Sequence, residues 1–258
     1  MQRAMSLDIS HILSQWPYKP GEVTARRVVG ADGQEKIQFR LDLGLLQMEA
    51  SGRPDGQRPQ GHESLLAYHE YLLQKHIDQT GRDAGFSLDE ADCEMLRGEG
   101  VMYYHRYLAE FVLGDYERVD RDTMRNMRLM DFCRKYARDE SDKYILEQYR
   151  PYVIMMCTRA RAHLAMNDSR LKVALAAARK GIADIEAFYD AFGGEKMREH
   201  SGELAVLRAL EKDLESKIPI DPVQKLRQEL AQAVEAEQYE RAAKLRDRLR
   251  NIDSQELG

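Results

Sequence analysis

Five basic side chains between residues 118 and 135 recur at a spacing that places them on one face of a helix. They are Arg118, Arg121, Arg125, Arg128 and Lys135, separated by 3, 4, 3 and 7 positions. A row of guanidinium groups can bind phosphate or an acidic protein surface. Asp120, Asp122 and Asp131 are close in sequence and favour a simpler interpretation, a solvated helix face. The sequence leaves both interpretations open.

A second candidate for anion binding is the loop at residues 51–61. Its segment Arg53-Pro54-Asp55-Gly56 fits a type I turn, with proline at the second position and glycine at the fourth. Arg53 and Arg58, next to exposed backbone, could receive an anionic ligand. The alternative is structural, with Arg53 and Asp55 holding the loop against the strands before it.

Catalytic and metal-binding patterns do not stand out. No Ser/His/Asp, Cys/His or paired-carboxylate arrangement has an interpretable spacing, so nothing argues for an enzyme or a cofactor. His62, His69 and His76 are seven positions apart, which separates successive rings on a helix by about 10 Å, too far to share a metal ion. The three cysteines are scattered, which disfavours disulfides and zinc and indicates a reducing cytoplasm. No apolar run approaches the roughly 18 residues that span a bilayer, so no membrane contact is expected.

Charge is spread unevenly along the 258 residues, although the net charge is only −5. Residues 118–180 hold 15 basic residues against 8 acidic ones, whereas the segments on either side are acidic. With 43% hydrophobic and 32% charged residues, the composition is that of a folded, helix-rich protein. The basic middle segment is where an anionic partner would be attracted.

Hydrophobic patterning predicts an α+β protein that is predominantly α. Residues 1–85 are expected to form a small β-hairpin/α region: strands at 23–28 and 37–43 flank an Asp-Gly turn, and a helix follows at 62–78. Residues 45–49 either extend the second strand or form a third.

Residues 86–218 are expected to form a body of antiparallel helices. Ser87 and Glu90 fit a capping box, followed by helices at 87–113, 116–138, 142–166 (kinked at Pro151) and 169–192. Two similar turns, at 113–116 and 166–169, lie 53 residues apart, and this repetition is similar to that of tetratricopeptide repeats. We therefore predict a TPR-like body.

Residues 219–258 are expected to form a helical hairpin. Asp221 and Pro222 are a strong helix start. Apolar residues then recur on one side of each helix: Leu226, Leu230, Ala233 and Val234 on the first, and Tyr239, Ala242, Ala243, Leu245 and Leu249 on the second. Because domains this small seldom hold a sufficient core alone, part of the stripe should meet a partner.

The segment AVEAEQYERAAKLRDRLR resembles the UVR (UvrB/UvrC) motif of bacterial proteins, in which an acidic turn precedes aromatic-Glu-x-Ala-Ala-x-x-Arg-Asp. The matching positions are Tyr239, Glu240, Ala242, Ala243, Arg246 and Asp247. The resemblance implies a hairpin that pairs with a similar hairpin on another chain, as in UvrB, UvrC and the ClpC protease system with its adaptor McsA. The chain lacks a phosphate-binding GxxxxGK[ST] loop, a UvrC nuclease pattern and the McsA zinc cysteines.

These observations predict a non-enzymatic adaptor that docks a UVR-bearing or similar partner through residues 221–252, with self-association included. The expected partner-binding residues are Leu226, Leu230, Val234, Tyr239, Ala242, Ala243, Leu245, Arg246 and Leu249. The alternative is a nucleic-acid-associated protein, linked to DNA repair. Its anion-binding candidates are Arg118, Arg121, Arg125, Arg128, Arg53 and Arg58.

Overall fold

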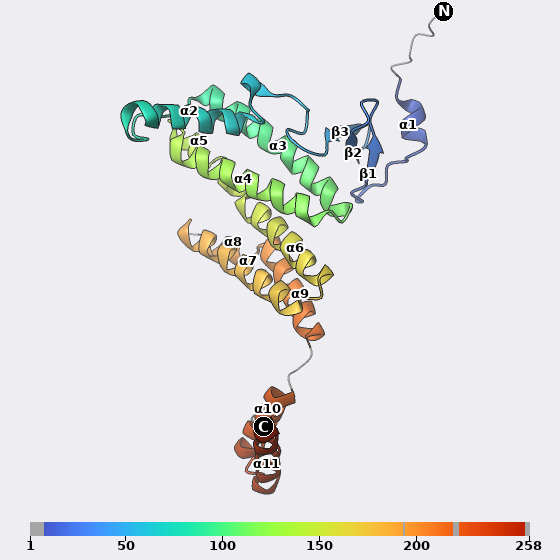
Figure 1. The fold of residues 1–258 in the computed structure, drawn as a ribbon, viewed down its shortest axis with the longest axis vertical. Helices are drawn as coiled ribbons and strands as arrows, with labels where there is room; N and C mark the ends of the chain where they lie inside the picture. Colours follow the sequence, from blue (N-terminus) through green and yellow to red (C-terminus); the bar gives the residue numbers. More distant parts are fainter. Residues whose placement is uncertain (1–7, 193, 219–221, 256–258) are drawn as a thin grey trace, which may run out of the picture. The chain divides into compact units, whose positions relative to one another are not determined.

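A computed structural model describes residues 8–192, 194–218 and 222–255. The protein is mostly helical, with an N-terminal three-stranded antiparallel sheet, a helical body and a C-terminal helix pair (Figure 1). The chain divides into two compact units, Met1–Glu211 and Lys212–Gly258. Within the described residues, no helix is both long and apolar enough to cross a bilayer.

The N-terminal sheet confirms the predicted hairpin, but the second strand ends at Arg40 and not at residue 43, and Leu41 and Leu43 are exposed. Residues 45–49 form a third strand. The strands of the sheet, in the order β1-β2-β3, are β1 (Ala25–Val29), β2 (Glu35–Arg40) and β3 (Leu45–Glu49). The turn between β1 and β2 contains Gly33 at φ 74°, a left-handed conformation that favours glycine. Ile37 and Phe39 of β2 are buried and pack with Ala109 of the helical body, so the apolar face of the sheet covers a helix.

The opposite face of β2 is covered by polar contacts. Lys36 forms ion pairs with Asp32 and Glu49 at 2.6 and 2.5 Å, and Gln38 bonds to side chains of both neighbouring strands. The polar side chains of β2 are therefore buried as well.

Helices make up most of the remaining chain before the C-terminal pair. Short ones are α1 (Ser10–Ser14), α5 (Glu140–Tyr144) and α8 (Glu195–Glu199), and the long ones are α2 (Leu65–Thr80), α3 (Glu90–Val112), α4 (Tyr116–Tyr136), α6 (Arg150–Asn167), α7 (Leu171–Ala191) and α9 (Gly202–Lys217). The last of these, α9, runs from the first unit into the second. Helix α3 packs against α4, α4 against α6, and α6 against α7. The TPR-like character of this arrangement stays a prediction, as does the division of the chain at residues 85 and 218.

Two local expectations are wrong. The cap of α3 is Asp89. Its carboxylate accepts a hydrogen bond from the Asp92 backbone N–H, and the Asp92 carboxylate accepts one from the Asp89 backbone N–H. The capping box therefore starts two residues after Ser87. The predicted continuous helix 142–166 is interrupted, because α5 ends at Tyr144 and a 3-10 turn (Glu147–Tyr149) precedes α6. Pro151 lies in the first turn of α6, where its missing N–H costs no hydrogen bond, so it starts a helix and does not kink one.

Among the described residues, three buried clusters hold the first unit together. The largest draws on α3, α4, α6, α7 and α9 and contains Tyr107, Val119, Met155, Met156, Ala160, Ile185, Tyr189, Leu204 and Leu207. Another joins α2, α3 and α4 through Leu66, Leu88, Cys93, Leu96, Leu129, Phe132, Cys133 and Ala137. The third is the contact of the sheet with α3 described above. The two larger clusters meet the same pair of helices, α3 and α4, which therefore form the centre of this unit.

Helices α6 and α7 approach closely at Gly181. A Cβ at this position would overlap the Thr158 hydroxyl and lie 2.8 Å from the Thr158 Cβ. Gly181→Ala is therefore expected to lower the free energy of unfolding by about 1–3 kcal/mol, measured by urea denaturation. Gly98→Ala, in a helix with no atom within 4 Å of the added carbon, is the matched control and should raise stability by up to about 1 kcal/mol. Equal effects of the two changes would contradict the steric explanation.

Candidate functional site

The C-terminal helices form the predicted hairpin. They are α10 (Pro222–Glu235) and α11 (Tyr239–Gln255), which pack against each other. The turn between them closes through a bond from the Gln238 N–H to the Ala233 carbonyl at 2.8 Å, with Glu237 at φ 57°. A non-glycine residue in this left-handed region is uncommon, and the helix pair on both sides holds it there.

Among the side chains that the structure describes, a small apolar core joins the two helices. Ala233, Ala242 and Leu245 are buried, and Leu226 and Leu230 are half-buried against them. Alanine at two of these positions allows the helix backbones to approach closely. This core is much smaller than those of the first unit.

Apolar side chains remain exposed around the hairpin turn. Val234 is 52% exposed and Tyr239 is 68% exposed. Tyr239 also lines an open hollow of about 600 Å³ with Glu237, Gln238, Glu240, Arg241 and Lys244. Of the other predicted partner-binding residues, Ala243 and Leu249 are half-buried, and Arg246 is exposed with Asp247 at 3.1 Å. The hairpin thus presents an aromatic ring within a charged rim.

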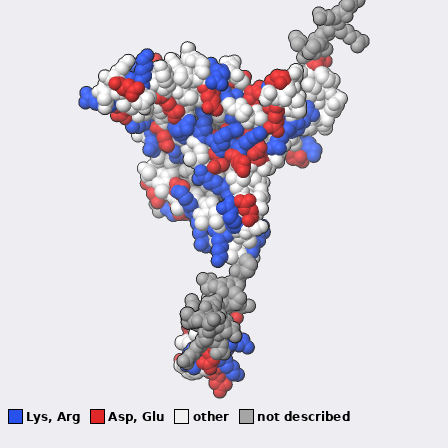
Figure 2. Space-filling view, viewed as in Figure 1, with Lys and Arg blue, Asp and Glu red and all other residues white. Residues whose placement is uncertain are grey.

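The basic side chains of α4 lie on one helix but not on one free surface. Arg118 pairs with Glu35 of β2 at 2.8 Å, Arg128 with Glu70 of α2 at 2.9 Å, and Lys135 with Asp83 at 2.8 Å. Arg121 and Arg125 bond to carboxylates of the body. Figure 2 shows basic and acidic side chains intermingled over the face of the body in view.

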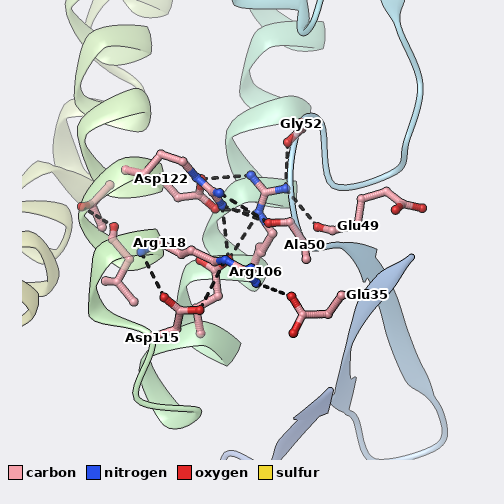
Figure 3. Close-up of polar contacts among 12 residues, drawn as sticks. Glu35, Glu49, Ala50, Gly52, Arg106, Asp115, Arg118 and Asp122 are labelled. Carbon is pink, nitrogen blue, oxygen red and sulfur yellow. Dashed lines mark hydrogen bonds and ion pairs between the residues drawn. The ribbon is translucent and has the colours of Figure 1, made fainter. Parts of the chain in front are cut away.

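A buried ion pair between α3 and α4 lies beneath this row (Figure 3). The Arg106 guanidinium donates to both oxygens of Asp122 at 2.6 and 2.9 Å, and each side chain is 1% exposed. Its remaining N–H group donates to the carbonyls of Glu49 and Gly52, at 3.0 and 2.7 Å. Arg106 therefore connects both central helices to the segment after β3.

Glu99 of α3 makes a comparable connection to α2. Its side chain is fully buried and accepts from the backbone N–H groups of Leu65 and Leu66 at 2.6 and 3.1 Å. These are free donors at the first turn of α2, where a carboxylate is favourable. Arg125 and Arg53 both pair with Glu99, so one carboxylate joins α2, α3, α4 and the loop.

The loop forms the predicted turn, with a bond from the Gly56 N–H to the Arg53 carbonyl at 2.9 Å. Arg53 is 9% exposed and contacts Asp55 as well as Glu99. Arg58 bonds weakly to the Gly61 carbonyl at 3.4 Å. Both arginines line a hollow of about 570 Å³ that also contains acidic side chains, Asp32, Glu49 and Glu63.

Glu110 is an unusual member of this charged region. It is fully buried, its Oε1 accepts from Arg121 at 3.2 Å, and its Oε2 has no partner among the described residues. Burial, helped by the nearby charge of Asp122, raises the pKa of Glu110 to about 8 against the opposing effect of Arg121 and Arg106.

The burial of Glu99, Arg106 and Glu110 is not evident from the sequence. Charged residues inside an amphipathic helix normally lie on its solvent face, and the helix that covers them is distant in sequence. Glu99, Arg106 and Glu110 are spaced by 7 and 4 positions, which places them on one side of α3. This spacing was the feature of the sequence that could have indicated a charged cluster on one side of α3.

Comparison with known families identifies the hairpin. Residues 221–255 match the family model described as the UvrB/uvrC motif, so the chain carries a UVR motif at its C-terminal end. This motif mediates protein–protein interaction in UvrB and UvrC. Comparison with curated proteins finds no match, and neither does comparison with solved structures.

Proposed function

We propose that this chain is a non-enzymatic adaptor that docks a UVR-bearing or similar protein through α10 and α11, while its helical body holds a second client. The observation that carries the proposal is the exposure of Val234 and Tyr239 on a helix pair with a matched UVR motif. Aromatic side chains ringed by polar groups are common anchors of protein interfaces.

The size of the hairpin supports this proposal. Helical units of roughly 40 residues or fewer usually need a partner, a metal or a disulfide to be stable. Among its described side chains, the hairpin buries three in its own core, and it holds no cysteine. A second helix pair packed on Tyr239 would add the apolar contact that the core lacks. A second copy of this chain is one such pair, which makes self-association part of the proposal.

The thiol chemistry also supports a binding protein in a reducing cytoplasm. Cys93, Cys133 and Cys157 are buried and free. Burial raises the pKa of Cys93 and Cys157 to about 11 and that of Cys133 to about 12, so none of these thiols is a nucleophile near neutral pH.

The ion pairs of α4 favour a protein partner over a nucleic acid. Nucleic-acid binding draws its affinity from cations that can neutralise successive phosphates. Arg118, Arg128 and Lys135 are each held by a carboxylate, which competes with the phosphates of a nucleic acid.

The docking proposal is tested by introducing charge at the exposed apolar positions. In the full chain, Val234→Asp with Tyr239→Asp is expected to reduce recovery of a co-purifying UVR-bearing protein at least tenfold. Both side chains are exposed, so the hairpin should remain helical by circular dichroism. Leu245→Asp would disrupt the buried core of the hairpin itself, so loss of recovery with that variant would not distinguish docking from unfolding.

Gln232→Asp with Arg248→Gln is the matched control. It changes the charge by the same amount at two exposed positions on the sides of α10 and α11 opposite Val234 and Tyr239. Recovery should stay within twofold of the unmodified chain. Equal recovery with the Val234/Tyr239 and the control variants would refute docking through this surface.

A further inference from the structure

A cavity of about 780 Å³ opens on the body between the loop after β3, the start of α2, and α3 and α4. Five of its lining residues are arginines: Arg106, Arg121, Arg125, Arg128 and Arg150. Two of them matter most for a ligand. Arg121 is 41% exposed at the cavity, and Arg125 is 10% exposed within it. All the residues belong to the first unit of the chain.

Two hydroxyl groups, of Tyr103 and Ser64, line the same cavity. Tyr103 is 4% exposed, and no hydrogen bond of its hydroxyl is found within the described part of the chain. The Ser64 oxygen accepts from the Ala67 N–H at 3.1 Å, which leaves the Ser64 hydroxyl proton without an acceptor among those same residues. The Arg125 Nε, in the same wall, is buried and has no hydrogen-bond partner among those residues. A buried donor of this kind normally has a partner, so it indicates an acceptor that the described residues do not supply.

Carboxylates in the cavity wall are already engaged. Asp122 accepts two bonds from Arg106 and one from Arg121, and Asp131 pairs with Arg150. Glu63, the other acidic lining residue, is exposed. Among the described residues, the Arg121 Nη1 makes a single bond, to the Ala50 carbonyl at a long 3.4 Å. It can therefore donate to an incoming oxyanion while Nε and Nη2 keep their bonds to Asp122 and Glu110.

We propose that this cavity binds a phosphomonoester group. A phosphomonoester carries nearly two negative charges and three acceptor oxygens, which suit the Arg121 guanidinium and the hydroxyls of Tyr103 and Ser64. The side chains of Met124 and Met127 lie in the same wall and provide an apolar surface for the carbon atoms next to the phosphate. This site does not depend on the hairpin and is distinct from the docking surface.

A nucleic acid fits the site less well. Its phosphodiester chain would need free cations on both sides of the cavity along α4, where Arg118 and Arg128 are paired with Glu35 and Glu70. Binding should therefore involve one phosphate group per chain and depend weakly on the length of a ligand.

Titration calorimetry of the full chain with phenyl phosphate and with inorganic phosphate tests the site. We expect one phenyl phosphate per chain. Tyr103→Phe removes only the unpartnered hydroxyl and should weaken binding about fivefold, because one hydrogen bond contributes about 1 kcal/mol. Arg121→Gln should weaken binding tenfold or more. Tighter binding of phenyl phosphate than of inorganic phosphate would identify a phosphorylated side chain as the source, and equal binding would identify free phosphate.

Arg134→Gln provides the matched control, because Arg134 is an exposed arginine of α4 that does not line the cavity. Its removal should change affinity less than twofold, and all variants should melt at the temperature of the unmodified chain within a few degrees. No binding of either phosphate, or equal weakening by Arg121→Gln and Arg134→Gln, would overturn the proposal. So would tight binding of a single-stranded oligonucleotide that phenyl phosphate does not displace.

Discussion

Replacing Arg106 with methionine is expected to lower the free energy of unfolding by about 3 kcal/mol, measured by urea denaturation followed by circular dichroism. The substitution keeps much of the side-chain volume but leaves the Asp122 carboxylate buried with Arg121 as its remaining partner. Removing one member of a buried ion pair commonly costs about 3–5 kcal/mol, because the other charge stays in a poorly solvating interior. The carbonyls of Glu49 and Gly52 lose a donor in the same step.

An exposed ion pair on the same body is the control. Arg161 bonds to Asp120 at 2.6 Å, but the two side chains are 43% and 31% exposed. Arg161→Met should therefore cost no more than about 1 kcal/mol. The double variant Arg106→Met with Asp122→Leu should recover part of the loss, because no charge is then left unpaired. A double variant no more stable than Arg106→Met would show that the lost contacts to the loop, and not the unpaired charge, dominate.

Local patterns were enough to predict most of the secondary structure. Alternation in β2, the Asp-Gly turn before it and the apolar stripes of α10 and α11 are each properties of consecutive residues, and the structure confirms them. The hairpin motif was also readable, because its residues Tyr239 to Asp247 form one continuous segment. A motif formed by consecutive residues can be recognised without knowledge of the tertiary fold.

The charged centre of the body could not be predicted in the same way. Glu99 contacts Leu65 at the start of α2, which lies 34 residues earlier in the sequence, and Arg106 contacts Gly52, which lies 54 residues earlier. Burial of these side chains depends on which helix covers α3, and a solvated face and a buried network have the same spacing in sequence. The break before Pro151 was missed for a related reason, since proline either kinks a helix or begins one according to how the preceding chain packs.

Burial of Glu110 in this network has a consequence for the pH dependence of stability. The pKa of Glu110 in the folded protein is raised to about 8, whereas a carboxyl group in an unfolded chain titrates near 4.5. Between these values the unfolded chain releases the proton that the folded protein keeps. Rising pH therefore favours unfolding, and this group's contribution to stability is lost as the pH increases from about 4.5 to about 8.

Glu110→Gln should consequently flatten the fall of stability with pH. Where only the folded state is protonated, one carboxyl group changes the free energy of unfolding by about 1.4 kcal/mol per pH unit. The variant cannot ionise at this position. Its free energy of unfolding, measured by urea denaturation at each pH, should therefore rise relative to that of the unmodified protein by up to this amount per pH unit between pH 5 and 8. Glu117→Gln removes a carboxyl group from an exposed position of α4 and should leave the curve parallel to that of the unmodified protein. Parallel curves for Glu110→Gln as well would mean that Glu110 is ionised in the fold, and that Arg121 outweighs the cost of burying the charge.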